Sequence, residues 1–332
     1  MKRDEQPMIG ESPAFLEVLE RVSAAAAMNR PILVVGERGT GKELVAERLH
    51  YLSPRWDQPL IKLNCAAISE ALLESELFGH EAGAFTDATR SRIGRFEAAD
   101  NGSLFLDELA STTPAVQEKI LRVIEYGQFE RLGSSQTRRV NVRLIGAANI
   151  DLPELAAQGR FRSDLLDRLA FDVITLPPLR ARREDIMPLA EAFAIGISRE
   201  LGRELFAGFS PDVQRRLQRY DWPGNIRELK NVVERAVYRH EGGDRPVAEL
   251  VLDPFDSPWR PDVGSEGSPG SADTVDPGRA PMDLRAYLSQ KEKEMTERAL
   301  RFSGGHQGKA AERLGLSYDQ LRGILKKHDL GA

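Results

Sequence analysis

Hydrophobic residues gather in five short runs along the first 180 residues, with longer stretches between them. The runs are rich in β-branched residues and lack polar alternation, which is typical of strands covered on both faces of a parallel sheet. They predict strands at residues 31–35, 60–65, 102–107, 142–149 and 171–176. The pattern therefore indicates an α/β fold with a five-stranded parallel sheet.

Beyond Arg180 the pattern becomes wholly helical. Apolar residues at helical spacing predict three helices, over residues 186–201, 211–220 and 225–240, that form a small lid. We therefore expect an α/β core at 1–178 and a helical lid at 179–252.

The composition changes after the lid. Residues 253–282 contain six prolines and four glycines among Asp, Ser and Glu, which predicts a flexible linker. Residues 283–332 return to helical periodicity, with Gly315 in a turn between two short helices. This is the pattern of an all-α helix-turn-helix domain.

The first run leads into a glycine-rich turn and a lysine, PILVVGERGTGKE. In such a loop, backbone N–H groups converge on phosphate oxygens, the next helix presents its positive end, and the lysine reaches the outer phosphates. The predicted nucleotide-binding residues are Gly36, Glu37, Arg38, Gly39, Thr40, Gly41, Lys42 and Glu43. Because Glu43 replaces the usual Ser or Thr, a bound Mg²⁺ must rely on other groups.

Two carboxylates close the third run, at Asp107 and Glu108. Ligands of open parallel sheets bind at the carboxyl ends of the strands. We expect Asp107 to orient the magnesium and Glu108 to polarise the attacking water, although both could simply cap the next helix. Asn149 ends the fourth run and is a candidate for holding the water or the terminal phosphate, or only a turn former.

Three arginines are further candidates. Arg162 and Arg168 lie on a short predicted helix, where salt bridges to Asp164 and Asp167 are the simpler interpretation. Arg227 lies in the first turn of the last lid helix, where a cation is mildly disfavoured. Its position suggests an external anion, and phosphate is the obvious one.

The segment GAFTDA, residues 83–88, consists of small residues around Phe85 and predicts a loop with an exposed aromatic tip. Phe85 is either a partner contact or an incidental exposed residue.

The tail concentrates positive charge. Between His306 and His328 there are five Lys or Arg residues against two acids, as a DNA-binding surface requires. Tyr318, Gln320 and Arg322 are expected to face base edges, and Lys326 and Lys327 to face phosphates, with Ser317 in the preceding turn as a further candidate. The alternative is a helical hairpin that serves dimerisation.

The composition excludes several classes of protein. The 46 basic and 51 acidic residues give a net charge of −5, so any nucleic-acid site must be local. Cys65 is the single cysteine, which excludes an internal disulfide framework. The amino terminus is charged and no apolar run reaches the roughly 20 residues of a membrane span, so a cytoplasmic protein is expected.

The motifs GERGTGKE, ELFGHEAGAFTDA, FLDE, FRSDLLDRL and WPGNIRELKN occur in this order. Together with the Fis-like tail they resemble the AAA+ bacterial enhancer-binding proteins, which activate sigma-54 RNA polymerase, and among these the activators of phage-shock operons. The resemblance implies an AAA+ P-loop ATPase that uses ATP and Mg²⁺, binds upstream enhancer DNA and forms a hexameric ring. Because the ATPase motifs begin near the amino terminus, a separate PspA-like negative regulator is also expected.

The resemblance also assigns roles to single residues. Asn64 would be the switch that restrains Glu108, Asn149 the first sensor and Arg227 the second. Arg162 and Arg168 would complete the site of a neighbouring subunit, and Phe85 and Thr86 would touch the sigma factor.

One position departs from the family pattern. The family has GAFTGA, whereas this chain has Asp87 in place of the second glycine. A glycine there permits a positive φ and close approach, while aspartate adds a charge. Two alternatives follow: a DNA-binding regulator with ATPase activity that does not activate sigma-54, and an AAA+ protein remodeller without a role in transcription.

Overall fold

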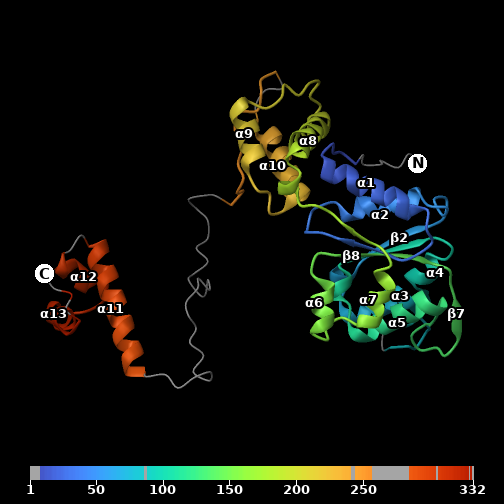
Figure 1. The fold of residues 1–332 in the computed structure, drawn as a ribbon, viewed down its shortest axis with the longest axis horizontal. Coiled ribbons are helices and arrows are strands. Elements are labelled where there is room, and N and C mark those ends of the chain that lie inside the picture. The colour runs from blue at the N-terminus through green and yellow to red at the C-terminus, as the bar shows by residue number, and fades with distance from the viewer. Residues whose placement is uncertain are drawn as a thin grey trace. The chain divides into compact units, whose positions relative to one another are not determined.

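The computed structural model describes residues 8–85, 88–240, 244–255, 284–303, 306–328 and 330. The chain divides into two compact units, Met1–Phe255 and Asp256–Ala332, which are both drawn in Figure 1. Thr86 and Asp87, and residues 256–282 of the predicted linker, lie outside the described residues. No helix in the described part is long and apolar enough to cross a membrane.

The first unit is built on a sheet of five parallel strands, which confirms the predicted fold class. The strand order is β2-β5-β8-β1-β9. The strands are β1 Ile32–Val35, β2 Leu60–Asn64, β5 Ser103–Asp107, β8 Arg143–Ala148 and β9 Val173–Thr175. Each begins within two residues of its predicted start, because continuous apolar runs identify buried strands well.

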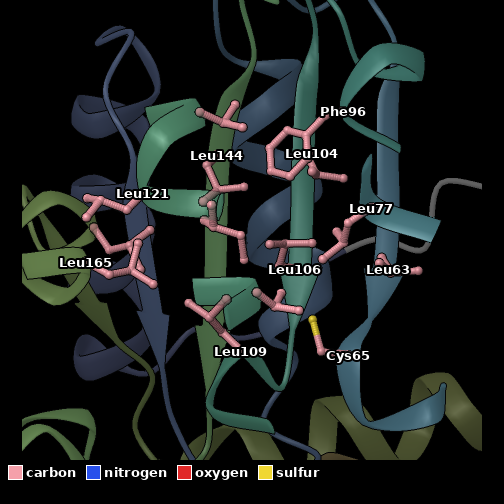
Figure 2. Packing of buried hydrophobic residues seen from close by; sticks show 14 of the residues in the cluster. Leu63, Cys65, Leu77, Phe96, Leu104, Leu106, Leu109, Leu121, Leu144 and Leu165 are labelled. Carbon is pink, nitrogen blue, oxygen red and sulfur yellow. The ribbon is translucent and has the colours of Figure 1, made fainter. Parts of the chain in front are cut away.

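Alternate residues of β1, β5, β8 and β9 supply two separate hydrophobic cores. On β1, Ile32 and Val34 pack with helices α1 (Pro13–Ala26) and α2 (Lys42–Tyr51). Leu33 points to the opposite face. Figure 2 shows that second core, where Leu104 and Leu106 of β5 and Leu144 of β8 meet residues of the covering helices. Burial on both faces explains the absence of polar alternation in the strands.

Five further helices of the α/β core lie between the strands in the sequence. They are α3 Glu70–Phe78, α4 Arg95–Ala98, α5 Pro114–Tyr126, α6 Leu152–Ala157 and α7 Ser163–Leu169. Short 3₁₀ turns lie at Cys65–Ala67, Leu109–Ser111, Leu179–Ala181 and Arg183–Asp185.

Two small antiparallel ladders lie outside the strands that the sequence predicted. They pair β3 (Gly79–His80) with β4 (Arg92–Ile93), and β6 (Gln128–Glu130) with β7 (Thr137–Arg139). Strands of two or three residues are too short to show a two-residue period, so the sequence pattern could not reveal them. β3 and β4 flank the GAFTDA segment in the chain, and Gly133 in the turn between β6 and β7 packs against Ala84.

The lid contains α8 (Ile186–Glu200), α9 (Pro211–Arg219) and α10 (Asn225–Arg239), as predicted. Its core includes Trp222, whose side chain is fully buried and whose indole N–H donates to the carbonyl of Leu217 at 2.9 Å. The lid therefore has a hydrophobic core of its own beside the sheet.

The second unit is all-α, with α11 (Leu284–Phe302), α12 (Gln307–Arg313) and α13 (Tyr318–Lys327). Ala310 and Ala311 are buried and let α12 approach its neighbours closely, while Leu321 and Leu325 of α13 complete the core. Gly315 adopts a φ of 65° in the turn between α12 and α13, a conformation that glycine adopts without strain.

Candidate nucleotide site and DNA-binding helices

The glycine-rich loop connects β1 to α2 as predicted. Gly39 and Gly41 have φ values of 77° and 99°, which L-residues with a side chain rarely adopt. A Cβ on Gly39 would lie 2.3 Å from the carbonyl oxygen of Gly224. The loop therefore requires glycine for both its conformation and its packing, and it presents the amino terminus of α2 as a phosphate site.

Lys42 is the first residue of α2, and its ammonium lies inside the loop. Nζ donates to the carbonyls of Gly36 at 2.8 Å and Glu37 at 3.0 Å. Burial lowers the pKa of Lys42 from its ordinary value, and the charges of Asp107 and Glu108 oppose that shift. The lysine thus lies between the loop and the two predicted catalytic carboxylates.

Asp107 ends β5 and Glu108 follows in a left-handed conformation, with a φ of 51°. Oδ1 of Asp107 accepts from the backbone N–H of Glu108 at 2.9 Å. The Glu108 carboxylate lies 3.6 Å from Nη2 of Arg38. An ion pair thus joins the candidate base to the phosphate loop, which the sequence did not suggest.

Asn64 ends β2 beside Asp107. Its amide Nδ2 donates to Oδ2 of Asp107 at 3.4 Å, so in this conformation Asn64 meets Asp107. The role of Asn64 as a switch on Glu108 stays a prediction.

Glu43 turns toward β2, where Lys62 holds it at 2.8 Å and also contacts Glu47. This explains how the loop tolerates a carboxylate after its lysine: a neighbouring strand supplies the counter-charge. Within the described residues no cluster of three or more His, Cys, Asp and Glu could hold a metal. Asp107 still suits Mg²⁺, which commonly takes one or two carboxylates and completes its shell with phosphate and water oxygens.

Asn149 directly follows β8 and lines a cavity with Gly36 and Glu37 of the phosphate loop. The carboxyl ends of β1, β5 and β8 thus bring together the loop, the two carboxylates and Asn149, as the sequence predicted from their positions.

Arg227 borders a second cavity of about 650 Å³, on the lid side of the loop. Thr40 and Gly41 line it from the loop, and Ile226, Arg227 and Lys230 line it from α10. Phe15 and Ile9 contribute apolar surface. The combination of apolar walls, cations and a helix amino terminus suits a nucleotide.

Sequence reasoning missed several residues of this cavity and loop. Arg182 is fully buried, lines the cavity and donates to the carbonyl of Thr40 at 3.2 Å. Arg180 and Asn225 both bond the Glu37 carboxylate, at 2.9 and 3.1 Å, and lower the pKa of Glu37 to about 2. In each of these three contacts the two residues are more than 140 positions apart in the chain. The one local signal was the Pro-Gly-Asn turn at the start of α10.

Arg162 and Arg168 are both paired within the chain. Arg162 contacts Asp164 at 2.8 Å and Glu118 at 3.5 Å, while Arg168 contacts Glu125 of α5 at 2.9 Å. The expected bridge to Asp164 is therefore present, whereas the acid that meets Arg168 is Glu125 and not the expected Asp167. Both arginines remain partly exposed, so exchange of these acids for another anion is sterically open.

Phe85 is 39% exposed and packs edge-on against His80, with the ring centroids 5.0 Å apart. Four residues before Phe85, Glu81 bonds Arg131 at 3.0 Å, and Arg131 also bonds Glu97 at 2.7 Å. The segment before Thr86 thus rests on an ion-pair network that joins the two small ladders.

The candidate DNA-binding residues lie on α13 and its amino terminus. Ser317 and Gln320 form a capping box, in which Gln320 Oε1 accepts from the Ser317 N–H at 2.8 Å. Tyr318 donates to Gln307 of α12 at 3.2 Å. Lys327, Lys326 and Arg322 are exposed, and Lys327 is paired with Glu292 of α11 at 2.6 Å. These contacts hold α13 against α11 and α12, while the contacts of these residues with DNA remain predictions.

Three family models match the chain. The sigma-54 interaction domain matches residues 8–175, the AAA+ ATPase lid domain residues 180–252, and the Fis family of bacterial regulatory proteins residues 287–328.

The chain is also similar to named proteins. It is 55% identical to the Psp operon transcriptional activator of Escherichia coli strain K12, over 97% of this chain and 98% of that one. It is 44% identical to the transcriptional regulatory protein ZraR of Klebsiella oxytoca, over 96% of this chain and 68% of that one. Solved structures of NtrX from Brucella abortus with ADP and with ATP each superpose with a TM-score of 0.69 at 32% identity. They cover 97% of this chain and 68% and 69% of theirs.

Proposed function

Since the chain belongs to the sigma-54-dependent transcriptional activators with an AAA+ ATPase domain, we propose that it hydrolyses ATP as a ring oligomer. We propose further that hydrolysis remodels the closed promoter complex of sigma-54 RNA polymerase into the open one. The domains would be the ATPase core at 1–178, the lid at 179–252, the linker at 253–282 and the DNA-binding domain at 283–332.

One observation carries this proposal: the ends of β1, β5 and β8 place Lys42, Asp107, Glu108 and Asn149 around one loop. Residues 36–43 would hold the phosphates, with Arg227 reaching them from the lid. Asp107 would hold Mg²⁺, which supplies charge neutralisation to phosphoryl transfer when bound. Glu108 would orient and deprotonate the attacking water.

Arg162 and Arg168 are the residues that make a ring necessary in this proposal. We infer that each exchanges its acid partner for the terminal phosphate of ATP bound to the adjacent subunit. Such a guanidinium stabilises the charge on the transferred group and can contribute about 10³-fold or more in rate.

A mixing experiment tests this inference. Arg168→Ala and Asp107→Asn are each expected to abolish turnover, for reasons that lie on opposite sides of the subunit interface. A mixture of the two restores some competent interfaces, so phosphate release should rise above the sum of the separate proteins. No recovery in mixed rings of confirmed composition would contradict action in trans.

Phe85 and Thr86 are proposed to contact sigma-54, and Asp87 bears directly on that contact. Binding of sigma-54 to the ring, with a trapped transition-state analogue of ATP, should be compared between this chain and Asp87→Gly. Stronger binding by the variant would show that aspartate weakens coupling. If neither protein binds, the chain is a DNA-binding ATPase that does not activate sigma-54.

Open-complex formation on a sigma-54 promoter with ATP is the broader test. We expect activity from the full chain and a need for higher protein concentration when residues 283–332 are removed, because that unit tethers the ring to upstream DNA. The absence of a footprint on upstream DNA would favour a protein remodeller that has no role in transcription.

The phage-shock genes are the proposed target, because of the 55% identity with the Psp operon transcriptional activator. The chain is expected to restore psp transcripts in an Escherichia coli strain that lacks that activator. Control by a separate PspA-like negative regulator is part of the proposal. A purified ring that stays inactive until a small molecule is added would contradict it.

A further inference from the structure

Asn225 occupies an unusual position between the phosphate loop and the lid. It is the first residue of α10, lies two residues before Arg227 and is fully buried. Its φ is 53°, a left-handed conformation that asparagine tolerates better than most residues with a side chain. A buried amide in this conformation needs hydrogen-bond partners on every polar atom.

The side chain of Asn225 finds partners in two other segments. Nδ2 donates to Oε2 of Glu37 at 3.1 Å and to the carbonyl of Arg38 at 3.0 Å, both in the phosphate loop. Oδ1 accepts from the N–H of Leu179 at 2.8 Å, where the chain enters the lid. One amide therefore joins the loop, the entrance to the lid and the start of α10.

The backbone around Asn225 packs on the loop as well. The N–H of Ile226 donates to the carbonyl of Gly39 at 3.0 Å. A Cβ on Gly39 would lie 3.1 Å from Cβ of Arg227. The backbone of Arg227 therefore lies against the phosphate loop. The side-chain hydrogen bonds of Asn225 hold it there.

Glu37 makes the arrangement specific. Its carboxylate accepts from Arg180 at 2.9 Å as well as from Asn225. Pairing with Arg180 keeps the Glu37 carboxylate ionised, so it can accept the directional hydrogen bond from the amide of Asn225. Glu37 and Asn225 are 188 residues apart in the chain, so the contact forms only when the lid docks on the core.

We propose that Asn225 is a positioning residue, which sets Arg227 of the lid against the phosphate loop so that its guanidinium reaches the bound nucleotide. The proposal rests on the proposed ATPase function and adds a residue that acts through Arg227. If Asn225 acts in this way, removing its amide weakens nucleotide binding because Arg227 is misplaced.

Asn225→Gly is the cleanest variant, because glycine adopts the same φ and loses only the side-chain hydrogen bonds. Asn101→Gly is the matched control, because Asn101 also has a positive φ, of 62°, but is exposed and precedes β5. We would measure the Kd for a fluorescent ATP analogue, and KM and kcat for ATP, on the full chain. Asn225→Gly should raise Kd and KM about tenfold, a change of the size expected for one or two buried hydrogen bonds, and the control should not.

A double-mutant cycle identifies the route. If Asn225 acts through Arg227, adding Asn225→Gly to Arg227→Ala should change the Kd of that variant by less than about twofold. Equal weakening in both backgrounds, or no weakening in the single variant, would overturn the proposal. If thermal melting shows that Asn225→Gly is unfolded, Asn225→Asp serves the same cycle, because it keeps the shape and the Leu179 bond while its carboxylate replaces the donor with a charge that repels Glu37.

The outcome for the wild-type chain separates the two hypotheses. A wild-type chain that binds ATP, with an Asn225 variant that binds equally well, would refute the positioning role alone. A wild-type chain that neither binds nor hydrolyses ATP would refute the proposed function, and the positioning role with it.

Discussion

Asn64 and Asp107 end two neighbouring parallel strands in register, and the Asn64 amide donates to Oδ2 of Asp107 at 3.4 Å. Oδ1 of Asn64 accepts from the N–H groups of Ala66 and Ala67, at 2.9 and 3.1 Å. Asn64 is therefore held on both sides, by a carboxylate proposed to bind metal and by the turn that follows β2. Movement of Asn64 toward Glu108 would first have to release Asp107.

Glu108→Gln is expected to reduce kcat by about 10²- to 10⁴-fold, because an amide cannot take the proton of the attacking water. The Kd for ATP should stay within about twofold of wild type, since the uncharged side chain keeps its size and the ion pair that it loses, to Arg38, is a 3.6 Å contact with an exposed arginine. Phosphate release and labelled-nucleotide binding check the two parts. Glu130→Gln, an exposed acid on β6, is the control. An equal loss of binding and turnover would place Glu108 in ground-state binding instead.

The Cys65 thiol should resist alkylation in the folded protein. Burial, followed by the charges of Asp107 and Glu108, raises its pKa to about 12 from 9.0. A raised pKa means that the folded state holds the proton more tightly. This contribution to stability is full below pH 9.0 and is lost as the pH rises through about 12. Iodoacetamide labelling at about pH 8 should be slow in the native protein and fast in denaturant. Because Cys65 is the single cysteine, equal rates in the two conditions would contradict the raised pKa.

Arg143→Met should destabilise the first unit by about 2–4 kcal/mol. Arg143 is buried, and its guanidinium donates to the carbonyls of Ala25 at 2.8 Å and Ala26 at 3.0 Å, at the end of α1. Methionine fills the space but donates to neither carbonyl, although the carbonyl of Ala25 still accepts from the N–H of Met28 at 3.2 Å. Arg122→Met is the matched control, since 65% of the Arg122 side chain is exposed. Urea unfolding should show a change within about 0.5 kcal/mol for Arg122→Met. Similar losses for both would show that the buried hydrogen bonds contribute little.

Lys326 and Lys327 offer a matched pair on the proposed DNA-binding helix. Both side chains are exposed, and Lys327 is paired with Glu292 at 2.6 Å. Lys326→Ala should weaken DNA binding for all sequences alike and make the slope of log K against log salt shallower by about 1. Lys327→Ala should change that slope less and lower the melting temperature of the helical unit more. Identical salt slopes for both variants would show that Lys327 leaves Glu292 on binding DNA.

Local patterns in the sequence predicted most of the secondary structure and the phosphate loop correctly. Continuous apolar runs located all five parallel strands, and the glycines and Lys42 identified the phosphate loop. Periodic apolar stripes located the helices of the lid and the tail. Each of these signals lies within about 20 residues of sequence, the range over which hydrogen bonding and side-chain period determine local structure.

The tertiary structure decided which of these side chains meet. The sequence by itself placed Asp107, Glu108 and Asn149 at the ends of apolar runs, but only strand order put Asn64 beside Asp107. Likewise, only docking of the lid brought Asn225 onto Glu37. A hydrogen bond or ion pair requires atoms within a few ångströms. For residues far apart in sequence, packing of the two cores and the lid supplies that proximity, and no local pattern encodes it.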